Sequence, residues 1–112
     1  MAGKFVLKKS SNGKFYFRLQ AGNGETLLMS EMYNAKPSAE NGIASVKTNA
    51  PDDDRYERKA AKNGQAMFNL KAANGQVIGT SESYSSEAAR EKGIASVKAN
   101  APDAKTDDQT AA

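Results

Sequence analysis

Two kinds of apolar spacing follow one another along this chain. Between residues 14 and 19 polar and apolar side chains alternate, so that Phe15, Phe17 and Leu19 fall on one face of a strand. Between residues 39 and 50 the apolar side chains recur every three or four positions, which is typical of a helix with one apolar face. The order of the two patterns predicts strands first and a helix after them.

The same pattern occurs twice. Residues 12–52 align with residues 63–103 without a gap, at an offset of 51, and roughly half of the aligned positions are identical. The longest match is GIASVKTNAPD at 42–52 against GIASVKANAPD at 93–103. A short internal repeat indicates one supersecondary unit built twice, with each copy supplying part of the other's core. Because no low-complexity linker separates the copies, we expect one pseudo-symmetric body.

Turn signals divide each copy into three strands. Asn-Gly pairs at 12–13 and 23–24, which recur at the matching places of the second copy, predict tight hairpin turns because both residues tolerate a positive φ. The third strand is expected at 26–32 in the first copy and at 77–83 in the second.

The helix of each copy has recognisable ends. Asn34 and Ser85 are expected as N-caps, because their short polar side chains can accept from amides of the first turn. Asn49 and Asn100 are expected to take the left-handed conformation that ends a helix, since a proline follows two residues later and blocks its continuation.

Together these elements predict an α+β fold. Two tandem β3-α-β repeats, residues 1–52 and 53–112, form one pseudo-twofold domain with a shared antiparallel sheet and two helices on one face. The extended segment 55–60 after the first helix also opens the second copy. After the second helix, 104–110 is either a short strand or a frayed tail, and its polar composition favours fraying beyond about residue 108.

The repeated motifs carry a family resemblance. The Asn-Gly turns, the SExY sequence at 30–33 and 81–84, and the doubled GIASVKxNAPD resemble the YegP-like family of small bacterial proteins. Members of that family are duplicated domains of unknown function. The resemblance implies two β3-α-β units that form a single sheet with exchanged C-terminal strands, and it implies no activity.

Composition excludes several classes of chemistry. The 112 residues include no Cys, no His and no Trp, so the sequence predicts no disulfide, no thiolate metal site and no histidine base. No stretch has the apolar run of a signal peptide or a membrane-spanning helix, so we expect a cytoplasmic protein without a membrane partner. No residue pattern nominates a catalytic residue, a metal ligand or a cofactor.

Charge points to one candidate binding face. The formal net charge is +3, and residues 1–51 alone carry seven Lys or Arg against three Glu, a net +4. In this basic part Lys8, Lys14, Tyr16 and Arg18 alternate with the apolar positions of their strands, so they are expected on the face away from the core.

Three interpretations of this face remain open. It is a solvated polar surface, a surface for a protein partner, or a weak binding site for single-stranded nucleic acid in which Tyr16 stacks on a base. The second copy has no aromatic residue at the matching positions, which weakens the nucleic-acid interpretation.

Four pairs of identical residues form a second set of candidates, for which we expect structural roles. Gly42 and Gly93 would allow close packing of the helices. The glutamates at the strand ends would accept backbone hydrogen bonds where strand meets helix, or face water, rather than perform acid–base chemistry or hold a cation. The acidic run 52–54 is expected to be a solvated loop rather than a metal site. The full set is Glu31, Tyr33, Gly42, Asn49, Glu82, Tyr84, Gly93 and Asn100.

The sequence therefore leaves the function unassigned. The leading hypothesis is a small non-enzymatic binding or protein-interaction module. The alternative is a weak binder of single-stranded nucleic acid, and a more remote one is an enzyme that uses carboxylate or lysine chemistry. We expect a monomer, because the duplication can replace a dimer.

Overall fold

The computed structural model describes residues 3–110. Seven strands and two α-helices form the fold, together with one 3₁₀ turn, η1. In chain order they are β1 (Lys4–Lys9), β2 (Phe15–Gln20), β3 (Thr26–Met29), α1 (Lys36–Asn49), η1 (Asp53–Arg55), β4 (Tyr56–Ala60), β5 (Ala66–Lys71), β6 (Val77–Thr80), α2 (Glu87–Asn100) and β7 (Lys105–Asp108).

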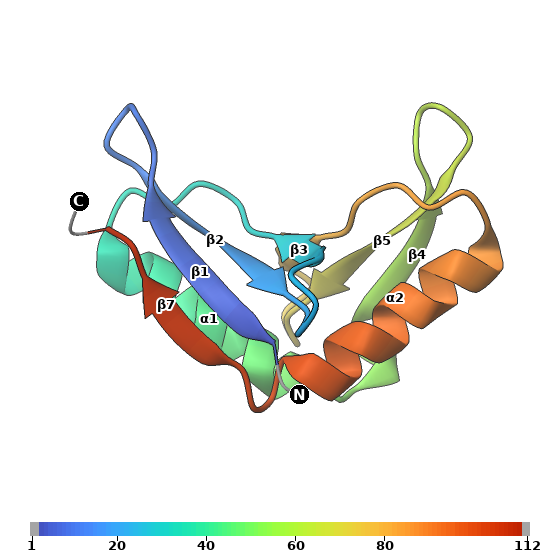
Figure 1. Ribbon diagram of the computed structural model, residues 1–112. Coiled ribbons are helices and arrows are strands. Elements are labelled where there is room, and N and C mark those ends of the chain that lie inside the picture. The colour runs from blue at the N-terminus through green and yellow to red at the C-terminus, as the bar shows by residue number, and fades with distance from the viewer. Residues whose placement is uncertain (1–2, 111–112) are drawn as a thin grey trace.

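All seven strands belong to one sheet, in the order β4-β5-β6-β3-β2-β1-β7. The two repeats meet at the centre, where β3 and β6 pair antiparallel with Met29 opposite Thr80. The hairpin turns between β1 and β2 and between β4 and β5 rise on one side of the central strands, and the two helices lie on the other (Figure 1). The predicted α+β fold with two tandem units and one sheet is confirmed, with a parallel β1–β7 pair as its one departure from antiparallel pairing among residues 3–110.

The hairpin turns form where the Asn-Gly pairs predict them. The glycines of all four pairs have φ between 82° and 88°, a region that other residues rarely adopt. In each turn the glycine is preceded by an asparagine, and at Asn23 the side chain accepts from the amide of Glu25 at 3.0 Å. These local bonds fix the connection and the register of each strand pair.

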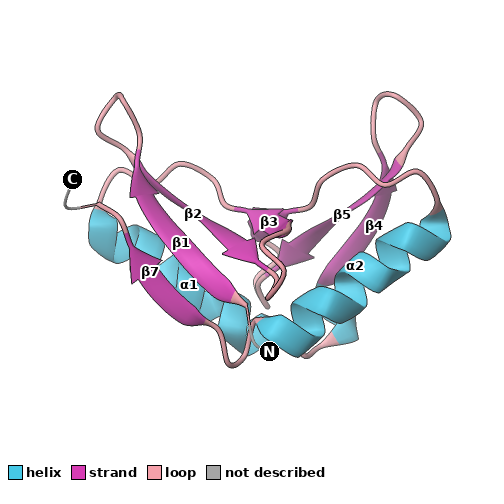
Figure 2. Ribbon diagram, viewed as in Figure 1, coloured by secondary structure: helices cyan, strands magenta, loops and turns pink. Residues whose placement is uncertain are grey.

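The core lies between the sheet and the helices (Figure 2). The apolar stripe of α1 is buried, and so are the alternating positions of the strands. A β-bulge in β3 directs two consecutive side chains, Leu27 and Leu28, into the core. The largest fully buried side chains are Phe5, Leu7, Phe17, Leu19, Leu28, Val46, Phe68, Leu70, Ile94 and Val97.

The third strands are shorter than predicted. β3 ends at Met29. The amide of Ser30 still donates to the carbonyl of Phe17 at 2.9 Å, but the amide of Phe17 donates at 2.8 Å to Ser30 Oγ, so a side-chain oxygen takes the place of a backbone acceptor. Ser81 Oγ repeats this contact with the amide of Phe68 at 2.9 Å after β6. Beyond these contacts, isolated β-bridges pair Phe15 with Tyr33 and Ala66 with Tyr84. The prediction of strands up to residues 32 and 83 was therefore wrong.

The predicted helix caps were wrong by one residue. The N-cap positions are Ala35, which has no side chain able to cap, and Ser86, whose Oγ accepts from the amide of Ala89 at 3.0 Å. Asn34 and Ser85 precede these positions.

The predicted left-handed ends of the helices were also wrong. Among residues 3–110 no residue other than glycine has a positive φ. Asn49 Nδ2 instead donates to the carbonyl of Ser45 at 2.8 Å, and Asn100 Nδ2 donates to that of Ser96 at 2.7 Å. Each asparagine stays helical because its side chain bonds one turn back.

The segment after α2 forms a strand. β7 runs parallel to β1, and the amide of Gln109 donates to the carbonyl of Leu7 at 2.8 Å. The second repeat thus returns its last strand to the first repeat, as the family resemblance implied. The fraying expected beyond about residue 108 falls partly on residues 111–112, which lie outside the described residues.

Candidate functional site

The face of the sheet turned away from the helices, called the open face below, carries the predicted basic residues. Lys8 of β1 pairs directly with Tyr16 of β2, so their side chains are neighbours on this face. Two positions further along β2, Arg18 lies between Val6 and Met29. Strand alternation thus places three of the four predicted residues in one contiguous area.

The fourth predicted residue lies apart from this area. Lys14 precedes β2 in the hairpin turn and is exposed. The structure also differs from the expected solvated face at Val6, which is only 3% exposed although it lies beside Arg18. The open face is therefore partly apolar around Arg18.

Arg18 has a polar atom without a partner. Its Nε is fully buried and forms no hydrogen bond with any of the described residues. Next to it in the adjacent strand, the side chain of Met29 is 43% exposed. A guanidinium group that lacks an acceptor beside an exposed methionine suits a ligand with a carboxylate or carbonyl oxygen and an apolar part.

The matching area of the second repeat is satisfied internally. Asn69, the counterpart of Arg18, accepts from Thr80 Oγ1 at 2.9 Å and donates to Glu57 at 3.1 Å. Glu57 also accepts from Lys71 at 3.1 Å, and the bonds from Asn69 and Lys71 hold the pKa of its carboxyl below the usual range. The two halves of the open face therefore differ, and only the half with Arg18 has a buried side-chain donor without an acceptor among residues 3–110.

Tyr16 is also exceptional among the aromatic residues. The chain has four Phe and four Tyr, all within the described residues, and seven of these eight belong to the core or pack against it. Tyr16 is the exception and is half-buried on the open face. An aromatic side chain that takes no part in the core is a common anchor for a binding partner.

The repeated glycines and tyrosines form one structural device. The Tyr33 ring stacks on Phe17 with centroids 6.3 Å apart, and a Cβ placed on Gly42 would lie 2.5 Å from the Tyr33 hydroxyl. In the second repeat, a Cβ on Gly93 would lie 2.7 Å from Cζ of Tyr84. Each glycine thus makes room for a tyrosine ring against the helix, and burial raises the pKa of both tyrosines.

The repeated glutamates do not assemble a site. Glu31 and Glu82 are both exposed, and neither forms an ion pair among the described residues. In residues 3–110 no group of three or more acidic, His or Cys side chains is arranged to hold a metal ion. Asp53 of the acidic run instead pairs with Lys98 at 2.7 Å and Arg58 at 3.0 Å, and these bonds lower the pKa of its carboxyl.

The sequence did not predict that Met29 lies beside Arg18 on the open face. The β-bulge and the early end of β3 decide which side chains of β3 reach that face. The sequence also did not predict the orphaned Nε of Arg18, since the burial of one atom depends on neighbours from other strands. The serines of the SExY motif, Ser30 and Ser81, could have been recognised from the sequence as hydrogen-bonding residues. They occur in both repeats, and serine side chains often bond to backbone groups.

Comparison with known proteins shows the class to which this architecture belongs. The chain matches the family described as "Domain of unknown function (DUF1508)" twice, at residues 10–57 and 61–108. The chain belongs to this family of uncharacterised bacterial proteins with tandem repeats.

Individual relatives cover almost the full length. The chain is 57% identical to UPF0339 protein YegP of Escherichia coli (strain K12) over 110 residues, which are 98% of this chain and 100% of the relative. It is 58% identical to a UPF0339 protein from the ptx operon 5' region of Stutzerimonas stutzeri, over 94% of this chain and 95% of the relative. Their names assign no function.

Two solution NMR structures share the fold. That of the Escherichia coli protein of unknown function yegP superposes with a TM-score of 0.94 at 56% identity and covers 100% of this chain and 97% of that one. That of a UPF0339 protein from Shewanella oneidensis has a TM-score of 0.92 at 54% identity, with coverages of 98% and 93%. The fold is thus established in the family, and the function is not.

Proposed function

We propose that the protein is a small non-enzymatic binding module that docks a partner protein on its open face. The partner segment presents a carboxylate or carbonyl oxygen to Arg18 and an apolar side chain to Met29 and Tyr16. The observation that carries the proposal is the buried Nε of Arg18 without an acceptor beside exposed apolar surface. A buried donor without a partner costs free energy. A ligand oxygen would recover it by drawing the Arg18 side chain outward, because its Nε is buried in the unbound protein.

The internal repeat supports this choice of face. Asn69, Glu57 and Lys71 satisfy one another in the second repeat, while the matching positions of the first do not. The first repeat therefore leaves a side-chain donor for a partner to satisfy, and the second does not.

The test compares two variants matched position by position. Lys8→Glu with Tyr16→Ala alters the candidate area, and Lys59→Glu with Met67→Ala makes the equivalent changes in the second repeat. Tagged versions of each and of the unchanged protein are used to capture proteins from bacterial lysate, and the captured proteins are quantified by mass spectrometry. A partner retained by the control and lost from the first variant supports the proposal.

Arg18→Gln supplies the specific measurement. Once a partner is purified, titration calorimetry should show weaker binding to Arg18→Gln than to the unchanged protein, by about tenfold for one charged hydrogen bond. If the variant at Lys8 and Tyr16 stays folded and keeps every partner, the open face is a solvated surface and the proposal is wrong.

A second candidate is weak binding of single-stranded nucleic acid. The adjacency of Lys8, Tyr16 and Arg18 in the more basic repeat favours it, because a cation and an aromatic ring together can hold a phosphate and a base. The lack of a second aromatic side chain on this face favours the protein partner instead. A mobility shift of a labelled oligonucleotide that weakens steeply with added salt would favour nucleic acid.

The proposed module acts as a monomer in the cytoplasm. The duplication brings β3 and β6 together within one chain, as a dimer of single repeats would do between two chains. Among the described residues no helix is long and apolar enough to cross a membrane. Sedimentation analysis and cell fractionation test the two parts of this statement.

A further inference from the structure

The sheet ends differently on its two sides. β7 pairs parallel with β1, whereas no described strand pairs with the outer edge of β4. At the offset of 51, β4 is the counterpart of β1, so the two edges can be compared position by position. The half that contains β4 has the same three strands and the same helix without a fourth strand. β7 is therefore an addition to the first repeat rather than a part of the repeated unit.

β7 buries no apolar side chain of its own. Its sequence is KTDD, and three of its four residues are exposed while Asp107 is half-buried. The residue before the strand, Ala104, is 2% exposed and belongs to the core. Segments with few buried apolar contacts open at a lower free energy than core strands. β7 can therefore leave the sheet while Ala104 and the rest of the fold stay in place.

Besides its backbone pairing, β7 is joined to the other described elements by two ion pairs. Asp108 pairs with Lys36, the first residue of α1, at 2.6 Å, and Asp107 lies 3.6 Å from Lys4 of β1. All four of these side chains are at least 36% exposed, and ion pairs at such exposed places contribute little stability each. The contact thus consists of groups that any extended acidic segment carries.

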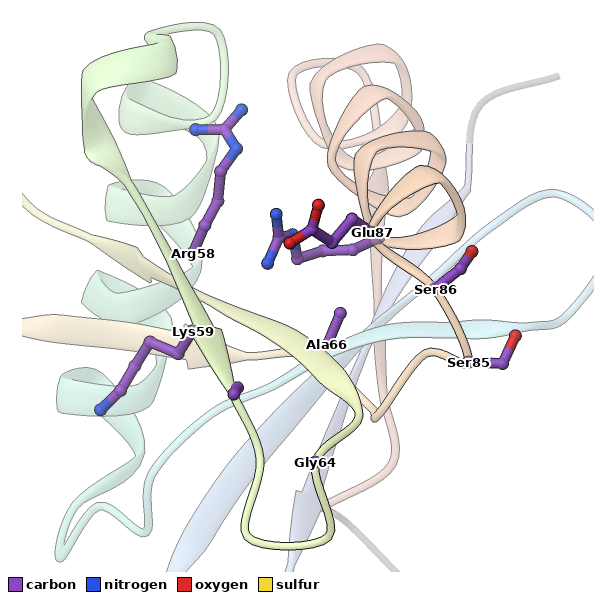
Figure 3. Close-up of a pocket in the computed structure, with 9 residues that line it drawn as sticks. Arg58, Lys59, Gly64, Ala66, Ser85, Ser86 and Glu87 are labelled. Atoms are coloured by element: carbon purple, nitrogen blue, oxygen red, sulfur yellow. The ribbon is translucent and has the colours of Figure 1, made fainter.

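The second repeat does not offer this pair of cations. The counterpart of Lys36 is Glu87, a carboxylate, which lies beside a hollow of about 540 Å³ between β4 and α2 (Figure 3). The counterpart of Lys4 is Arg55, which already donates to Asn49 at 3.0 Å. In the described part of the chain, the edge whose lysines reach an added strand is thus the one that holds an acidic strand.

Charge also disfavours a second β1 strand as the occupant of this edge. The sequence of β1, KFVLKK, has three lysines and no acidic residue. Antiparallel pairing of two such strands around Val6 would place Lys4 of one strand opposite Lys8 of the other. Like charges directly opposite each other destabilise a strand pair, whereas an acidic segment is attracted to the same edge.

We propose that the edge of β1 and the first turn of α1 are a docking site for an extended acidic segment of a partner protein, and that β7 fills this site until the partner segment replaces it. The incoming segment pairs parallel with β1, and its carboxylates accept from Lys4 and Lys36 as those of β7 do. Backbone pairing supplies affinity in such strand addition, and the side-chain contacts supply specificity. The site uses neither Arg18 nor Tyr16 of the open face, so each proposal can fail without the other.

Hydrogen exchange on the unchanged full chain tests whether β7 opens by itself. The amide of Gln109, directly after β7, donates to the carbonyl of Leu7 at 2.8 Å. This amide and those of β7 that face β1 should exchange about tenfold faster or more than the paired amides of β2 and β5, because they open in a local rather than a global unfolding. Equal protection of all these amides would show that β7 opens only with the whole protein and would overturn the proposal.

Peptide binding tests the site itself. The probe is a peptide with the sequence of residues 103–110, DAKTDDQT, added to ¹⁵N-labelled full chain. It should shift the amide signals of β1 and of the first turn of α1. The double variant Asp107→Asn with Asp108→Asn should bind the probe about three- to tenfold more tightly than the unchanged protein, because its own β7 has lost both ion pairs and competes less well.

Charge changes on both sides of the contact supply the controls. In the double variant, Lys36→Gln should weaken binding of the probe about threefold, whereas Lys92→Gln, a change at an exposed lysine of α2, should leave it unchanged. A peptide with asparagine in place of both Asp107 and Asp108 should bind more weakly than the acidic probe. Absence of shifts, equal binding of the two peptides, or shifts confined to β4 would overturn the proposal. Dimers of the unchanged protein that exchange β7, detected by sedimentation, would also overturn it, because the occupant would then be a second copy.

Discussion

Leu28 of β3 lies against Gly79 of β6, and a Cβ placed on Gly79 would be 3.2 Å from Cδ1 of Leu28. At the offset of 51 these two residues occupy equivalent positions of the repeat, next to the pair formed by Met29 and Thr80 at the centre of the sheet. Two large side chains do not fit there. The repeats have therefore diverged where their symmetry would bring identical residues into contact.

The first prediction follows from this contact. Gly79→Leu should lower the free energy of unfolding by about 1–3 kcal/mol, because the new side chain overpacks the centre of the sheet. Urea denaturation measures the change. The double variant Leu28→Gly with Gly79→Leu should be more stable than the sum of the two single effects implies, since it exchanges the large and the small residue.

Val77→Leu is the matched control for this prediction, because residue 77 lies in the same strand but is half-exposed. Its effect should stay within about 0.5 kcal/mol. Strictly additive effects in the double variant would show that Leu28 and Gly79 do not share one space.

The second prediction concerns the glycine in α2. Gly93→Leu should destabilise the protein by about 1–3 kcal/mol or more, because the space beside Gly93 is filled by the Tyr84 ring. Ala95→Leu places the same side chain at an exposed position of the same helix and should change stability by less than about 0.5 kcal/mol. Equal urea midpoints for the two variants would contradict the packing role of Gly93.

The third prediction concerns the two repeats as separate chains. Residues 1–52 and 53–112 should each fail to fold alone, because α1 contacts β6 of the second repeat and α2 contacts β3 of the first. The buried hydroxyl of Tyr56 also donates across the boundary to the carbonyl of Ala50 at 2.8 Å. Amide NMR spectra of each fragment check this expectation, and a well-dispersed spectrum from a monomeric fragment would refute it.

The fourth prediction concerns the pH dependence of the β7 contact. The hydrogen bond from Lys36, followed by those from Thr110, holds the pKa of the Asp108 carboxyl well below its usual range. A carboxyl whose pKa is lower in the folded state stabilises the protein above its unfolded pKa of about 3.9, and this contribution is lost as the pH falls through the folded value. Asp108→Asn should therefore lower the melting temperature near neutral pH.

The difference in melting temperature between the two proteins should decrease as the pH falls below about 5 and toward the lowered folded pKa of Asp108, because the carboxyl of the unfolded chain takes up a proton before that of the folded protein. Asp103→Asn alters an exposed residue of the preceding turn and serves as the control. A difference that stays constant or grows toward acid pH would show that the ion pair with Lys36 does not hold β7.

Features that depend on near neighbours in the chain could be predicted from the sequence. The alternation of Phe15, Phe17 and Leu19 defines the core face of β2, and the Asn-Gly pairs define the hairpins, because strand periodicity and turn conformation are properties of a few adjacent residues. The same alternation placed Lys8, Tyr16 and Arg18 on one face. The shared sheet was predictable because the pattern occurs twice without a linker between the copies.

The tertiary structure decided what depends on distant partners. The segment KTDD of β7 has no apolar alternation, so only the edge of β1 and the cation of Lys36 make it a strand. Asn49 remains helical because its side chain bonds back to Ser45 and accepts from Arg55. Within residues 3–110, the Nε of Arg18 without an acceptor and the outer edge of β4 without a paired strand likewise depend on which strands meet, and the free energy of such long-range contacts is not encoded in local spacing.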